Sequence, residues 1–257
     1  RFAESGQSSV CGRGSDVDYI VNFEAEPGYR YWDSDEFTYD SDDNLIGTEK
    51  QEVHRDETEY SGNVNLGFNL DRSTLKLNGL LEQLGDSPTD RERITADLIS
   101  GNVRAQSDQQ STTRKNWEIG GDYEYEVDSN SRFRVLFIVN DRNSTYDRIR
   151  YDVADQERSP NLFLDRLSRD RERIVRTSFT RNLTEKQGLE LGAEGAQTIR
   201  DSDLKMGLDT PGVPNESYGN LVPVSVDNSK STVQEIRYEP FTIHNWQIND
   251  LQSQILL

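Results

Sequence analysis

The stretch from Trp117 to Val139 reads WEIGGDYEYEVDSNSRFRVLFIV, which is the pattern of two strands joined by a polar turn. Before the turn at Asp128–Ser131, apolar and acidic residues alternate, with the apolar set Trp117, Ile119, Tyr123, Tyr125 and Val127. After the turn, Phe133, Val135, Phe137 and Val139 share one face, and Arg132, Arg134 and Asn140 lie on the other. Because successive strand side chains point to opposite faces, the stretch predicts an antiparallel hairpin with one apolar and one polar face.

Three other segments have the same design. Around the turn at Asp71–Ser73 the apolar positions are Val64, Leu66, Phe68, Leu70, Leu75 and Leu77. Around the turn at Thr184–Gln187 they are Val175, Phe179, Leu189, Leu191 and Ala193. A fourth turn is predicted at Asn249–Asp250, after a strand with Phe241, Ile243, Trp246 and Ile248 that alternates poorly.

The four turns are spaced about 57, 56 and 65 residues apart. Each interval holds one strand, a polar connection of roughly 33 residues that we read as a long loop, and a returning strand. Short turns on one side and long loops on the other are typical of a membrane β-barrel. We therefore predict an all-β fold, an antiparallel transmembrane β-barrel segment of about nine up-and-down strands with short periplasmic turns and long extracellular loops. The strands are expected within 17–39, 49–70, 74–98, 114–127, 132–153, 171–181, 188–204, 231–248 and from 251 onward. The stretch 165–173 is charged enough to form a short surface helix.

Composition supports a fold without a thick interior. The chain has 257 residues, a net charge of -18, 32% hydrophobic residues and a mean hydropathy of -0.86. The longest apolar run, Val135–Val139, is far shorter than the roughly 20 residues that a helical membrane span needs. The acidity argues against a nucleic-acid partner, since phosphate binding needs basic patches. The single cysteine, Cys11, excludes an intrachain disulfide.

Two segments carry a resemblance to a known family. They are Phe179–Thr184 together with Gly188–Ala196, and the stretch from Glu239 to Asp250. Both resemble barrel segments of TonB-dependent outer-membrane receptors, in strand style rather than in an invariant motif.

The resemblance implies a bacterial outer-membrane location and a barrel of about 22 strands closed around an N-terminal plug. It also implies outer-membrane lipid, a small nutrient ligand such as an iron chelate, and the periplasmic energy-coupling protein TonB as partners. Residues 1–257 would then be a single partial barrel domain, truncated at both ends, without the plug and the final strand.

No catalytic, cofactor or metal residue is predicted, and we expect no enzyme. His54 and His244 are far apart and lie in no metal-ligand spacing. The tip at Asp40–Asn44 begins like a calcium loop, but Leu45 and Gln51 occupy the positions where an EF-hand needs Gly and Glu. Ligand-binding residues are unknown at this point. The candidate surface is the set of loops around Asp40–Gly47, Leu98–Lys115, Tyr151–Arg171 and Asp201–Lys230, whose acidity favours cationic or metal-bridged ligands.

Two other classes of protein fit the pattern. A passive, porin-like outer-membrane barrel shares the alternating strands and lacks a plug. A soluble extracellular all-β binding protein would pack two sheets face to face, with shorter strands and shorter loops.

Overall fold

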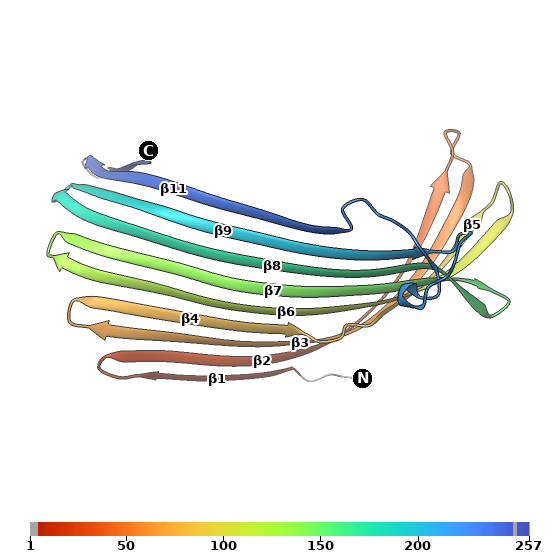
Figure 1. The fold of residues 1–257 in the computed structure, drawn as a ribbon, viewed down its shortest axis with the longest axis horizontal. Helices are drawn as coiled ribbons and strands as arrows, with labels where there is room; N and C mark the ends of the chain where they lie inside the picture. Colours follow the sequence, from red (N-terminus) through yellow and green to blue (C-terminus); the bar gives the residue numbers. More distant parts are fainter. Residues whose placement is uncertain (1–4, 249–250, 257) are drawn as a thin grey trace.

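The computed structural model describes residues 5–248 and 251–256, which form one long antiparallel sheet (Figure 1). Its elements are β1 (Gly6–Arg13), β2 (Val17–Tyr39), β3 (Leu45–Leu70), β4 (Ser73–Leu84), β5 (Thr89–Asp97), β6 (Asn102–Asp128), β7 (Ser131–Ala154), β8 (Glu157–Thr184), β9 (Gln187–Leu208), the short 3-10 helix η1 (Glu216–Tyr218), β10 (Val222–Pro223), β11 (Lys230–Ile248) and β12 (Leu251–Leu256). Across the sheet the order is β1-β2-β3-β4-β6-β7-β8-β9-β11-β12, so the predicted all-β, up-and-down antiparallel arrangement is confirmed.

The three best-patterned turns lie where the sequence predicts them, at one end of the sheet. Residues 71–72 join β3 to β4, residues 129–130 join β6 to β7, and residues 185–186 join β8 to β9. The turn predicted at Asn249–Asp250 lies outside the described residues. We call this end of the sheet, on the left in Figure 1, the turn end and the opposite end the tip end.

The connections at the tip end differ from the prediction, because most of the expected loops are strands. The connections there are residues 40–44, 98–101, 155–156 and 209–229, so three of the four are short. The predicted loops Leu98–Lys115 and Tyr151–Arg171 lie largely within β6, β7 and β8, and the stretch 165–173, considered for a helix, is part of β8. At about 3.4 Å per residue, the 28 residues of β8 extend about 90 Å.

The first strand, β1, is not among the nine expected strands. It is rich in glycine and serine and pairs with β2 from Gly6↔Ala25 to Arg13↔Asp18. Residues with small or absent side chains have no strong period of two, so the sequence pattern does not reveal this strand.

The strand predicted at 74–98 is present as two strands, β4 and β5, which follow each other in one line and are separated by residues 85–88. β4 and β5 both lie between β3 and β6, β4 toward the turn end and β5 toward the tip end. Between the pairs Leu84↔Glu59 and Thr89↔Arg55, the segment that joins β4 to β5 has four residues, whereas β3 has three. The extra residue makes a bulge, where Pro88 supplies no N–H and Ser87 is buried.

The sheet has no thick hydrophobic core. Among the described residues only Val53, Leu84, Leu162, Leu221 and Ile243 are buried apolar side chains. The accessible surface is 17702 Å², whereas a compact protein of 29.4 kDa exposes about 11,500 Å². The described residues therefore form a single layer, and the second sheet of a sandwich is not among them.

No helix in the described part of the chain is both long enough and apolar enough to cross a membrane.

Candidate functional site

The strand register places the apolar positions of all three well-patterned hairpins on one face of the sheet. Residues directly opposite each other in neighbouring strands share a face. One such row runs Tyr19↔Leu66↔Leu77↔Gly121↔Phe137↔Val175. The rows on either side of it continue the same face with Val64, Phe68 and Leu75 among others. We call this face the outer face and the opposite one the inner face.

The outer face carries a continuous apolar belt near the turn end. We define this apolar belt as the outer-face residues of segments 17–21, 64–70, 73–79, 119–125, 133–139, 173–179, 191–197 and 236–242. Within these segments Arg173 is the only charged side chain on the outer face. Ile119 and Val175 are 52% and 50% exposed, so no other described residue covers the belt.

On β6 the apolar run of the outer face extends two residues past the apolar belt at each end. The outer-face residues of β6 remain apolar or glycine from Trp117 to Val127, a stretch of about 34 Å at about 3.4 Å per residue. A tilt of about 40°, usual for membrane barrels, reduces this to about 26 Å. The apolar band of outer-membrane barrels is about 25 Å tall, which the run on β6 matches, whereas the run Phe133–Val139 on β7 is about 20 Å long and about 16 Å at the same tilt.

The inner face behind the apolar belt is charged. In the same segments it carries nine charged side chains: Asp18, Lys76, Asp122, Glu124, Arg134, Arg176, Glu194, Arg237 and Glu239. Some are paired across strands, as Arg134 is with Asp122 and Arg237 with Glu194. The same segments of the inner face also carry Ile20, Leu136, Ile138, Ile174 and Phe241, so this face is mixed. A sheet with one nearly uncharged face and one charged, mixed face fits hydrocarbon on one side and water on the other.

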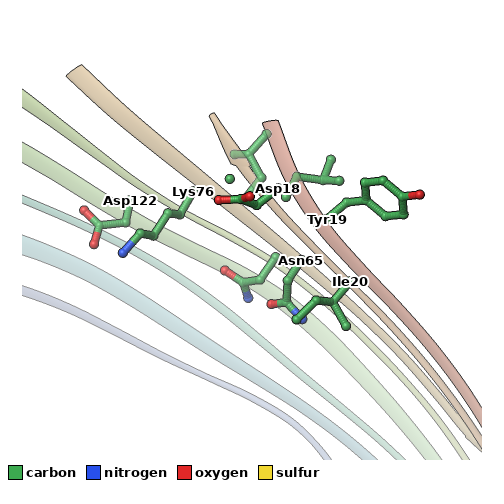
Figure 2. Close-up of a pocket in the computed structure, with 10 residues that line it drawn as sticks. Asp18, Tyr19, Ile20, Asn65, Lys76 and Asp122 are labelled. Carbon is green, nitrogen blue, oxygen red and sulfur yellow. The ribbon is translucent and has the colours of Figure 1, made fainter. Parts of the chain in front are cut away.

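A hollow of about 490 Å³ lies in this wall where β2, β3, β4 and β6 meet. Figure 2 shows Lys76, Asn65 and Asp122 on one side of the strands and Tyr19 on the other. Gly67, opposite both Asp18 and Lys76, leaves the space between these two side chains open.

Toward the tip end, the inner face carries a group of arginines that the sequence analysis did not single out. They are Arg30, Arg55, Arg91, Arg93, Arg104, Arg148 and Arg150. Arg148 donates to the buried Asp108 at 2.7 Å, and Arg150 donates to Asn161 at 2.7 Å. The Nε atom of Arg91 is buried and has no hydrogen-bond partner in the described structure. The only sequence signal for the group is basic residues at alternate positions, as in Arg91 and Arg93.

Two carboxylates on β7 have opposite electrostatic environments. Arg104 donates to Asp152 at 2.8 and 3.1 Å, and this contact, together with hydrogen bonds from Asn161 and Gln106, lowers the pKa of Asp152 to about 2. Asp147 points to the outer face, where burial and the neighbouring Asp165 and Asp86 raise its pKa. In the tip half of the sheet, specific ion pairs therefore accompany the buried apolar side chains Val53, Leu162 and Leu221.

The loops proposed from the sequence as a ligand surface lie at the tip end, although most of their residues are in strands (Figure 1). At the tip 40–44, the Asp40 carboxylate accepts hydrogen bonds from the backbone N–H groups of Asp42 and Asn44, both at 2.9 Å. The hydrogen bonds from Asn44 and Asp42 lower the pKa of Asp40. The carboxylate is thus used to close the turn.

The two histidines lie at opposite ends of the sheet, with ordinary aromatic neighbours. His54 lies 4.8 Å from the Tyr31 ring, and His244 lies 6.4 Å from the Trp246 ring. Within the described residues no group of His, Cys, Asp and Glu side chains has a geometry that could hold a metal ion.

No protein-family model matches the chain, and no curated protein matches it significantly.

Proposed function

We propose that this chain forms part of the wall of a bacterial outer-membrane β-barrel of the TonB-dependent receptor type. The observation that carries the membrane part of this proposal is the apolar belt, whose apolar run on β6 is about 26 Å tall when tilted, backed by an inner face with nine charged side chains. A soluble protein rarely leaves so large an apolar surface uncovered.

The length of the strands supports a receptor with a tall extracellular wall. About 11 residues cross a membrane when a strand is tilted, whereas β6 and β8 have 27 and 28 residues. The rest of each strand extends past the apolar belt toward the tip end. Such a wall would surround a vestibule for a scarce nutrient such as an iron chelate, and import would use energy supplied through TonB. This part of the proposal rests on the resemblance of Phe179–Thr184, Gly188–Ala196 and Glu239–Asp250 to receptor barrels.

The membrane part is tested by fractionating the native, full-length protein and running the membrane pool unboiled and boiled on a gel. Detergent-dependent extraction with a mobility shift on boiling is the expected result. A freely soluble protein would overturn the proposal and favour a soluble β protein.

The receptor part needs a separate test, because a passive barrel would pass the first one. Uptake of labelled iron chelates is measured in cells with and without the gene, and with the proton gradient collapsed. We expect uptake that requires both the gene and the gradient. Uptake that persists without the gradient would instead indicate a porin-like barrel.

A further inference from the structure

The border between the apolar belt and the charged part of the outer face has a hollow with two kinds of lining. Its volume is about 480 Å³, and it lies over β2, β3, β4, β6 and β7. On the side of the belt it is lined by Phe23, Leu81 and Trp117. On the side of the tip end it is lined by Lys115 and Asn143, which lie directly opposite each other. Gly62, between Phe23 and Leu81, leaves the floor without a side chain.

The basic residues at this border are not fully neutralised by carboxylates. On β8, Arg169, Arg171 and Arg173 all point to the outer face. Arg169 pairs with Asp141, and Arg171 pairs with Asp201. Among the described side chains, Arg173 donates a hydrogen bond to the neutral Gln197, at 3.2 Å, and has no ion pair, and Lys115 has neither an ion pair nor a hydrogen bond. Both Lys115 and Arg173 are exposed. Two uncompensated positive charges therefore remain, in a chain whose net charge is -18.

We propose that this border site binds the phosphate-bearing headgroup of an anionic membrane lipid. Lys115 supplies the charge at the hollow, and the start of an acyl chain packs against Phe23, Leu81 and Trp117. Arg173 lies outside the hollow, two strands across and four residues nearer the turn end, about 17 Å from Lys115, and adds a second charge along the same border. Long basic side chains at the edge of an apolar surface extend toward the polar layer, where lipid phosphates lie. The proposal deepens the proposed function and rests on it, because the hollow meets lipid only if the apolar belt is in a membrane.

The test uses the full-length protein in nanodiscs of phosphatidylcholine with a minority of phosphatidylglycerol, and native mass spectrometry of the lipids that stay bound. The wild type is expected to retain phosphatidylglycerol in preference to phosphatidylcholine. In the double variant Lys115→Gln/Arg173→Gln this preference is expected to fall roughly 25-fold, since each basic residue near an anionic surface contributes about fivefold.

The matched control is Arg114→Gln/Arg176→Gln. These two residues lie on the same strands, β6 and β8, but on the inner face, and removing them changes the net charge by the same amount. The control is expected to keep the lipid preference. Equal loss in both variants, or retention in Lys115→Gln/Arg173→Gln, would overturn the site.

A second measurement needs no variant. A phosphatidylglycerol with a photoreactive group near its phosphate is crosslinked to the wild-type protein, and the adducts are mapped. Adducts are expected within 113–119 and 169–175, and their absence there contradicts the proposal. Each sample is also checked for the mobility shift on boiling. A shift without lipid preference rejects only the lipid site, whereas a soluble protein rejects the proposed function.

Discussion

At the residue scale, the two carboxylates of β7 lead to opposite predictions. The folded pKa of Asp152 is about 2, below the ordinary value of 3.8, so its contribution to stability is fully present above pH 3.8 and is lost as pH falls through 2. We expect Asp152→Asn to speed hydrogen exchange of the amides in 104–106 and 150–154 at pH 7, after correction for intrinsic exchange. The difference from the wild type should vanish as the pH approaches 2.

Asp147→Asn is the control on the same strand. The pKa of Asp147 is raised, so its ionised form is disfavoured in the folded state and stability rises as the carboxyl protonates. We expect this variant to leave exchange at pH 7 unchanged or slower. If both variants accelerate exchange equally, the ion pair with Arg104 is not the cause.

The tip of the β7–β8 hairpin supports a second residue-scale prediction. Asp155 and Gln156 form the whole turn, with φ of 51° and 70°, and neither is glycine. A left-handed conformation is unfavourable for a residue with a Cβ, and hairpin turns of this type favour glycine at the second position. We expect Gln156→Gly to stabilise the hairpin by up to about 1 kcal/mol, measured by hydrogen exchange at 151–160. Gln156→Ala, which keeps the Cβ, should give no gain.

At the scale of the element, the two faces of one strand can be compared with adjacent residues. Leu77 lies in the middle of the apolar belt, and Asn78 lies on the inner face. We expect Leu77→Arg to destabilise the folded protein in bilayers by about 2–4 kcal/mol in urea titrations. Asn78→Arg should cost much less. Similar costs at both positions would mean that the belt does not face hydrocarbon.

The sequence predicts the strands near the turn end because only one of their faces is apolar there. Leu66 and Asn65, or Tyr125 and Glu124, mark opposite faces, and the period of two is visible. Toward the tip end both faces are polar, as Asp147 and Arg148 show on β7. The two-residue alternation of apolar and polar residues then disappears, so these strand residues have the sequence pattern of a loop. Cross-strand ion pairs such as Arg148–Asp108 depend on pairing between distant residues, which a single sequence does not display.

At the scale of the whole molecule, the sheet presents three unsatisfied surfaces. The apolar belt is uncovered, and β1 and β12 lie at the two edges of the described sheet. Open edges pair with other chains, and exposed apolar surface associates in water. We expect the 257-residue chain expressed alone to sediment in aqueous buffer. In detergent it should regain strand signal by circular dichroism without a mobility shift on boiling. A monomeric species in water without detergent would contradict this view.

The sequence was enough to predict the two-faced antiparallel sheet, but it did not predict the inner arginines or the border site. Alternation on β3, β4, β6 and β7 was enough to predict a two-faced antiparallel wall. The inner arginines and the border site at Lys115 and Arg173 depend on register across four or more strands. That register becomes visible only when the strands are placed side by side.

The bulge at residues 85–88 changes which residues, odd-numbered or even-numbered, face outward. In β4, up to Leu84, the odd-numbered residues face outward, and in β5, from Thr89, the even-numbered residues face outward. The extra residue keeps Arg91 and Arg93 on the inner face. Losing one residue here would turn the following nine residues over, so that both arginines faced outward and Ile94 faced inward. The length of this short segment therefore matters more than its composition. Adding or removing one residue would exchange the inward-facing and outward-facing side chains of β5.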